Sequence, residues 1–124
     1  MIDKIIKVIK KAKFKDSYGY QVTDGWNWML CPYCGHDYIH IGDILIVQKD
    51  FCTLVSRGKT STKVDDSFYE DSTTGSIIFT FLSCECCNPE IGQHFIRKEE
   101  FHDGNIRISF AKVKTQIPTE LWRD

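Results

Sequence analysis

Isoleucine and lysine alternate along the first fifteen residues with the period of a helix. On a helical wheel one side collects Ile2, Ile5, Ile6, Ile9 and Ala12, and the other collects Lys4, Lys7, Lys11 and Lys15. This pattern predicts an amphipathic helix over residues 1–15, which weakens near Ala12 because Lys13 falls on the apolar side. Two roles follow from it. The helix docks its isoleucines on a core and leaves the lysines in water, or the lysines form a basic face for nucleic acid or anionic lipid.

Later segments carry the residue types of strands. Tyr38 to Gln48 and Phe51 to Ser56 are rich in β-branched and aromatic residues and predict two adjacent strands. Ser76 to Cys84 predicts another strand, and residues 92–113 predict two strands around a turn at Asp103-Gly104. The expected fold class is therefore α+β, mainly antiparallel β, with hairpins and one short N-terminal amphipathic helix.

Polar segments separate these strands. Arg57 to Gly75 is polar and acidic, and it predicts an exposed loop. Asp16 to Trp28 mixes turn formers with aromatic residues, so that both a strand and an ordered loop fit it. No internal repeat or linker divides the chain, and residues 1–124 are expected to form a single domain.

Composition and charge narrow the class of protein. The chain of 124 residues is 42% hydrophobic, which argues against disorder, and contains no apolar run of the ~18 residues that a membrane span needs. The N-terminus lacks the pattern of a secretory signal, which favours the cytoplasm. The formal charge of -1 is unevenly divided, because six lysines and Asp3 give residues 1–15 a charge of +5 and leave -6 for the remainder.

Six cysteines supply the strongest chemical signal. Two C-x-x-C pairs, Cys31 with Cys34 and Cys84 with Cys87, have the spacing with which two thiolates bind one Zn²⁺ ion. Closing the longer loop between the pairs costs only ~1 kcal/mol more than closing a 15-residue loop, against ~10–16 kcal/mol of apparent zinc binding. The sequence therefore predicts a zinc-ribbon-like Cys₄ site. Cys86 is the spare thiol, and Cys52, inside a predicted strand, is expected to be buried.

Other ligand sets and chemistries stay open. His36 or His40 would give a Cys₃His site in place of Cys₄. A closed Cys₄ site has no open position for water, so we expect the metal to be structural and the protein not to be an enzyme. The alternative is C-x-x-C thiol redox chemistry or a zinc-dependent enzyme, with His102, Asp103 or Glu85 as acid-base groups.

The order of these motifs resembles a known group. C-P-Y-C-G followed by Tyr38 and His40, a strand into C-E-C-C, and a strand pair around Asp103-Gly104 look like the small zinc-ribbon-like proteins of bacteriophages and mobile elements. The likeness covers roughly Trp28 to Phe110, with Asp103 where such proteins usually have lysine. It implies a phage or mobile-element accessory protein that acts by binding a macromolecule.

The expected partner is nucleic acid or a host protein, and inhibition of a defence system is one form of the second. Aromatic residues such as Tyr33 and Tyr38, beside a basic helix, are typical of surfaces that hold single strands. The mildly acidic remainder of the chain leaves a protein partner equally open. The sequence leaves the oligomeric state open.

Overall fold

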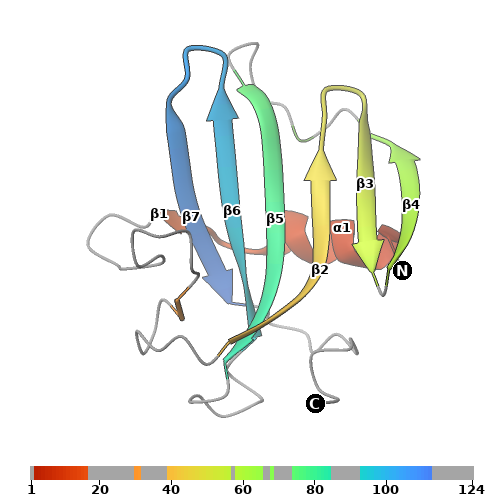
Figure 1. Cartoon of the computed structure of the whole chain (residues 1–124), viewed down its shortest axis with the longest axis vertical. Coiled ribbons are helices and arrows are strands. Elements are labelled where there is room, and N and C mark those ends of the chain that lie inside the picture. The colour runs from red at the N-terminus through yellow and green to blue at the C-terminus, as the bar shows by residue number, and fades with distance from the viewer. Residues whose placement is uncertain are drawn as a thin grey trace.

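The computed structural model describes residues 2–16, 30–31, 39–56, 58–65, 68, 74–84 and 93–112. These residues form one α-helix and a seven-stranded antiparallel sheet (Figure 1). The elements in chain order are α1 (Ile2–Lys11), β1 (Lys15–Asp16), β2 (Ile39–Val47), β3 (Phe51–Ser56), β4 (Lys59–Val64), β5 (Thr74–Cys84), β6 (Gln93–Phe101) and β7 (Ile106–Lys112). In this part of the chain no helix has the length and hydrophobicity that a membrane crossing requires.

Two antiparallel meanders make up the sheet. The strand order is β1-β7-β6-β5-β2-β3-β4, so that β2, β3 and β4 form one meander and β5, β6 and β7 form the other. The two meanders meet at a single pair of strands, β2 and β5, whose register runs from Ile39 opposite Cys84 to Val47 opposite Ile77. This pair is called the seam below. A register shift between Ile41 and Ile44 adds local twist to it.

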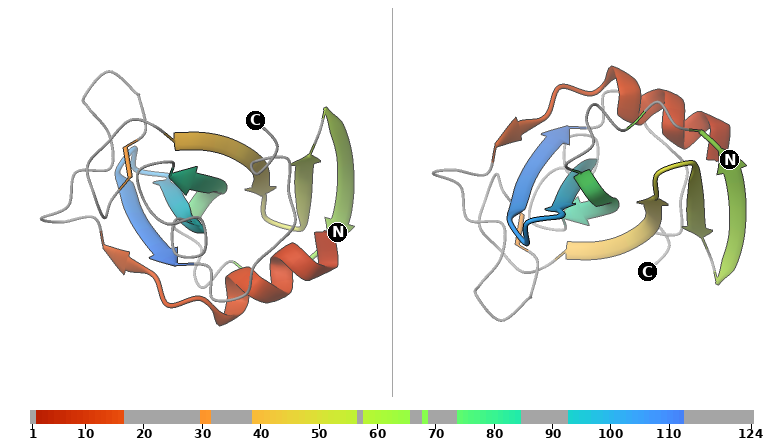
Figure 2. Two further views of the ribbon diagram at one scale, coloured as in Figure 1. Left: turned by 90° about the horizontal axis from the view of Figure 1, so that it is seen from below. Right: turned by 90° about the horizontal axis from the view of Figure 1, so that it is seen from above.

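Helix α1 lies across the concave face of the sheet. The end views in Figure 2 show the strands following an arc, with α1 crossing its open side. At one edge of the arc Asp3 and Lys63 of β4 form an ion pair, and at the other edge the chain passes from α1 into β1, which pairs with β7. The helix therefore links the two edge regions of the sheet.

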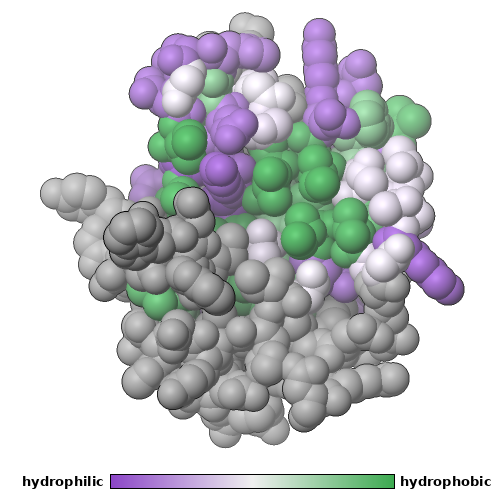
Figure 3. All heavy atoms as spheres, viewed as in Figure 1, coloured by the Kyte–Doolittle hydropathy of each residue, from purple (hydrophilic) through white to green (hydrophobic). Residues whose placement is uncertain are grey.

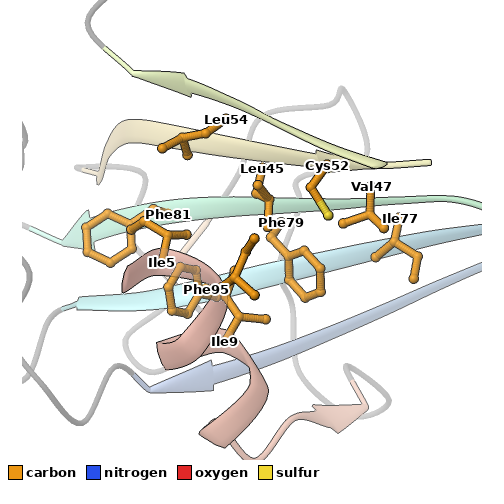
Figure 4. Packing of buried hydrophobic residues seen from close by; sticks show 11 residues of the cluster. Ile5, Ile9, Leu45, Val47, Cys52, Leu54, Ile77, Phe79, Phe81 and Phe95 are labelled. Carbon is orange, nitrogen blue, oxygen red and sulfur yellow. The ribbon is translucent and has the colours of Figure 1, made fainter. Parts of the chain in front are cut away.

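The main core lies between α1 and this concave face (Figure 4). The helix contributes Ile5, Ile6 and Ile9, each at most 4% exposed, as the hydrophobic periodicity predicts. The sheet contributes alternate residues of β2, β3, β5 and β6, namely Leu45, Val47, Cys52, Leu54, Ile77, Phe79, Phe81 and Phe95. Because side chains alternate between the faces of a strand, only every second residue reaches this core.

The opposite, convex face is also apolar but less buried. Ile44, Ile46, Ile78 and Ile108 are partly exposed on this face, which Figure 3 shows as an apolar area between polar and grey atoms. A second buried cluster, Leu82, Ile96 and Phe110, lies on the same face of β5, β6 and β7. Both faces of the sheet are thus apolar, and they differ in exposure.

The mainly antiparallel fold with an N-terminal helix is confirmed, and so are the strands predicted before and after the Lys49-Asp50 turn. The predicted hairpin is also present, and Gly104 in its turn has a φ of 90°, which favours glycine. The zinc-ribbon-like core stays a prediction, because the side chains of Cys34, Cys84 and Cys87 lie outside the described residues.

The prediction of a loop from Arg57 to Gly75 is wrong in two places. Residues 59–64 form strand β4, which pairs with β3 from Ser56 opposite Lys59 to Phe51 opposite Val64. Strand β5 already begins at Thr74. The polar composition of β4 reflects its place at the edge of the sheet, where lysine and threonine protect the open hydrogen-bonding groups from other chains.

The prediction that the helix extends over residues 1–15 is wrong at its C-terminal end. Helix α1 ends at Lys11, and the backbone N–H of Ala12 donates to the carbonyl of Ile9 at 3.1 Å. Another helical turn would place the charged Lys13 on the side that holds Ile9. Instead, Lys15 lies in β1, opposite Phe110 of β7.

Candidate functional site

The first candidate site is the end of the seam that carries the cysteines. Cys84 is the last residue of β5 and pairs with Ile39, the first residue of β2. Cys34 precedes Ile39 by five residues, a length of chain that reaches at most ~17 Å. The register therefore brings the second C-x-x-C motif to the end of the sheet from which the first motif leads in.

The structure describes only some of the six cysteines. Cys31 is fully buried, next to the buried Leu30. Cys34, Cys86 and Cys87 lie outside the described residues, as does the side chain of Cys84. Within the described ranges no group of three or more His, Cys, Asp or Glu side chains is placed to hold a metal ion. A set of four thiolates suits Zn²⁺ by its chemistry, so the predicted site stays a prediction here.

Cys52 confirms the expectation of a buried thiol. It is fully buried in β3, opposite Val47 and within the main core. Burial, and then the negative charge of Asp65, raise the pKa of the Cys52 thiol above its usual value of 9.0. Because the thiolate is the reactive form, Cys52 acts as a small apolar side chain rather than as a nucleophile.

The predicted basic residues of α1 are exposed. Lys4, Lys7 and Lys11 lie on the side of the helix opposite its buried isoleucines, and none of them makes an ion pair with a described residue. These three residues are called the lysine face below. Lys15 is also exposed, but it lies in β1 rather than on the helix.

Two other lysines, one in α1 and one in β4, are neutralised by acidic residues. Lys10 Nζ lies 3.1 Å from Asp65 Oδ2, and Lys63 binds Asp3. Both pairs lie on the flank of α1 that contacts β4. The lysine face, by contrast, carries positive charge without an acidic partner among the described residues.

The histidines and tyrosines singled out by the sequence fall in different places. His102 is exposed in the β6–β7 turn, and His94 is fully buried in β6, opposite Leu82. His40 lies in β2, and only its backbone is described. Tyr33, His36, Tyr38 and Glu85 lie outside the described residues.

Asp103, a proposed acid-base group, has a clear local role in the turn. The backbone N–H and the side-chain Nδ2 of Asn105 donate to its two carboxylate oxygens, each at 2.9 Å. Asp103 therefore stabilises the turn between β6 and β7.

A second candidate site, which the sequence did not indicate, is a cavity of about 590 Å³ between α1 and the sheet. It lies at the end of the sheet opposite the cysteines, where β5 and β7 begin and β6 ends. Its lining includes Phe14, Phe68 and Phe79 together with Arg97 and Glu99. A signal was present in β6, because the alternation that buries Phe95 also puts Arg97 and Glu99 on the concave face.

Comparison with known proteins gives no match to a protein-family model, to a curated protein or to a solved structure.

Proposed function

We propose that the protein is a non-catalytic, zinc-stabilised binding protein whose partner is a single-stranded nucleic acid. The observation that carries the proposal is the lysine face, three exposed lysines without acidic partners among the described residues. Lys4 and Lys11 are seven residues apart, about 10 Å along the helix axis. This length lets the lysines reach neighbouring phosphates of one strand.

The fold provides a rigid support for this face. Ile5, Ile6 and Ile9 pack against four strands of the sheet, so the orientation of the helix is fixed by its buried side. The ion pairs of Asp3 with Lys63 of β4, and of Lys10 with Asp65 directly after that strand, further limit rotation of α1. Phosphate contacts made by Lys4, Lys7 and Lys11 would then require ordering of the lysine side chains but no movement of the backbone.

Zinc is proposed as a structural ion at the cysteine end of the seam, held by Cys31, Cys34, Cys84 and Cys87. The support is the register of β2 and β5, since the first motif leads into one seam strand and the second begins in the other. One ion there would tie the two meanders together across the seam. The alternative of a redox or zinc-dependent enzyme stays a prediction, and so does a phage or mobile-element origin with a cytoplasmic location.

The experiment that tests the nucleic-acid proposal is a binding titration at two salt concentrations. Wild-type protein is titrated against a fluorescent single-stranded oligonucleotide and compared with the double variant Lys7→Ala and Lys11→Ala. Removal of two phosphate contacts should reduce the slope of log K against log salt by about 1.4. The matched control is Lys49→Ala, an exposed lysine of the β2–β3 turn, which should leave the slope unchanged. Absence of binding at low salt, or equal slopes for both variants, would rule the proposal out.

A protein partner is the second candidate, and the convex face favours it. Ile44, Ile46 and Ile78 are partly exposed there, and Ile106 is 54% exposed, which is typical of faces that contact other proteins. Substitution of Ile46 and Ile78 by lysine should abolish capture of such a partner and leave nucleic-acid binding intact. The opposite result, loss of nucleic-acid binding alone, would favour the first candidate.

A further inference from the structure

The cavity between α1 and the sheet has the size of a site for a small molecule. Its volume of about 590 Å³ is within the usual range of ligand pockets, ~300–1,000 Å³. Residues from both the helix side (Ile9, Phe14) and the concave face of the sheet (Ile77, Phe79) line it. The lysine face does not use this cavity, because it lies on the other side of α1.

Aromatic rings form one part of the cavity wall. The ring centroid of Phe79 lies 5.7 Å from that of Phe14 and 5.6 Å from that of Phe68, with the rings tilted by more than 50°. Phe101, also in the lining, adds a fourth ring. One wall of the cavity is therefore aromatic, and Lys10 and Arg97 lie over the rings of Phe68 and Phe14.

Glu99 supplies a hydrogen-bond acceptor that is not used within the described residues. Its Oε1 atom is buried and accepts no hydrogen bond from them, although Arg97 Nε lies 3.2 Å away. The geometry explains this, because Arg97 Nε donates instead to Ser109 Oγ at 2.9 Å. Buried polar atoms are nearly always hydrogen-bonded, so this oxygen points to a ligand that brings an N–H donor.

The charged side chains of the lining restrict the kind of ligand. Lys10, Arg97 and Arg107 line the same cavity, and the guanidinium of Arg97 lies 4.6 Å from the centre of the Phe14 ring. Lys10 pairs with Asp65, Arg107 pairs with Asp16, and Arg97 lies beside Glu99, so each cationic side chain of the lining has an acidic partner. A neutral aromatic ring with N–H donors for Glu99 and carbonyl or ring-nitrogen acceptors for arginine fits this balanced lining.

Guanine combines these groups in one ring system. Its N1–H and N2–H₂ groups are neighbouring donors that a carboxylate accepts, while O6 and N7 accept from arginine. Adenine offers a single donor group on the corresponding edge. We propose that the cavity binds a guanine base, with Glu99 as the specificity-determining residue. The base belongs to a free nucleotide or to an unpaired position of a single strand. The second source rests on the function proposed above, whereas the first does not.

The test measures binding of guanosine, adenosine and uridine monophosphates to the full-length protein by calorimetry. Guanosine monophosphate should bind about tenfold or more tightly than the other two. Glu99→Gln should remove this preference, because an amide presents both a donor and an acceptor to the base. Glu100→Gln is the matched control, since Glu100 is exposed and lies outside the lining, and the preference should persist.

A second variant and a second ligand series keep the outcomes distinct. Phe68→Leu, at a partly exposed ring, should weaken binding of all three nucleotides, and thermal melting reports whether each variant is folded.

A short oligothymidine with or without one guanine then shows whether the bound guanine belongs to a free nucleotide or to a strand. A guanine preference in the strand supports an unpaired base, and a preference limited to the monophosphate supports a free nucleotide. Equal binding of all three nucleotides, or no effect of Glu99→Gln, would overturn the guanine site. Strand binding through the lysine face without a guanine preference would overturn it and leave the proposed function standing.

Discussion

The two ends of the sheet bring together different kinds of residue. At one end β5 stops at Cys84 and β2 starts at Ile39, and the residues there that can bind a metal are cysteines. At the other end, where β5 starts at Thr74, the chain brings together phenylalanines, arginines and a glutamate around a cavity. The first set suits a structural metal, and the second suits a ligand that exchanges with solvent. Under the proposals above, the cysteine end contributes stability through its metal, and the cavity end and the lysine face provide recognition.

The largest effect is expected from loss of the proposed zinc ion. Cys84→Ser, or removal of zinc by a chelator, should unfold the protein at room temperature. Structural zinc sites supply ~10–16 kcal/mol of apparent binding free energy, which matches or exceeds the ~5–15 kcal/mol stability of a whole domain. Native mass spectrometry for zinc and circular dichroism for folding check this result.

Two controls identify the ligands. Cys86→Ser should retain both zinc and the fold, because Cys86 is the spare thiol of C-E-C-C. His36→Ala should also retain zinc unless the site is Cys₃His. A folded, metal-free Cys84→Ser protein would break the comparison, because stability would then not depend on the cysteine end.

The second largest effect is expected at Phe79, whose ring belongs both to the main core and to the cavity lining. Phe79 is 2% exposed and contacts the rings of Phe14 and Phe68. Phe79→Ala should reduce the free energy of unfolding by about 3–5 kcal/mol, as measured by urea denaturation. Its neighbour Ile78 is partly exposed on the convex face, and Ile78→Ala should cost about half as much or less. Equal losses would show that both faces of the sheet are equally well packed.

A smaller effect is expected for charges at the cavity end. Arg107 Nε lies 2.7 Å from Asp16 Oδ1, but the two side chains are 52% and 56% exposed. Exposed ion pairs contribute about 0–1 kcal/mol, so Arg107→Gln should change the free energy of unfolding by no more than that. A loss of several kcal/mol in a urea melt would show that this ion pair stabilises the cavity end as strongly as the aromatic wall does, and would contradict the prediction.

The smallest effect is the pH dependence of the pair that joins α1 to β4. The hydrogen bond from Lys63 holds the pKa of Asp3 below its usual 3.8, and the same bond holds the pKa of Lys63 above its usual 10.5. The contribution of Asp3 is therefore fully present above pH 3.8 and declines as the pH falls below that value, through the lowered pKa of the folded state. That of Lys63 is present below pH 10.5 and declines as the pH rises above it. The melting temperature of Asp3→Asn should differ slightly from wild type at pH 7, and the difference should vanish in acid. A difference that grows in acid would contradict this assignment.

Much of the fold could be predicted because the relevant signals are local. The period of Ile2, Ile5, Ile6 and Ile9 is that of a helix with one buried side, and Asp103-Gly104 favours a turn whatever the rest of the chain does. Strand β4 could not be predicted in this way. Its residues resemble a loop in composition, and only pairing with β3 makes them a strand.

The two candidate sites also differ in whether a local sequence signal predicts them. The cysteine spacing alone predicts a zinc site, because two thiolates separated by two residues suit one ion. The cavity could not be predicted, because Phe14, Phe68 and Glu99 come from three separate segments. Their proximity depends on the way α1 crosses the sheet, which is a property of the tertiary structure.

The position of α1 in the chain has a consequence for synthesis on the ribosome. The helix is made before every strand that covers it, and its partners extend as far as Phe95 in the sequence. Ile5, Ile6 and Ile9 therefore have no completed binding surface until most of the chain has been translated. Such distant contacts slow folding and leave an apolar helix accessible to chaperones or to other nascent chains.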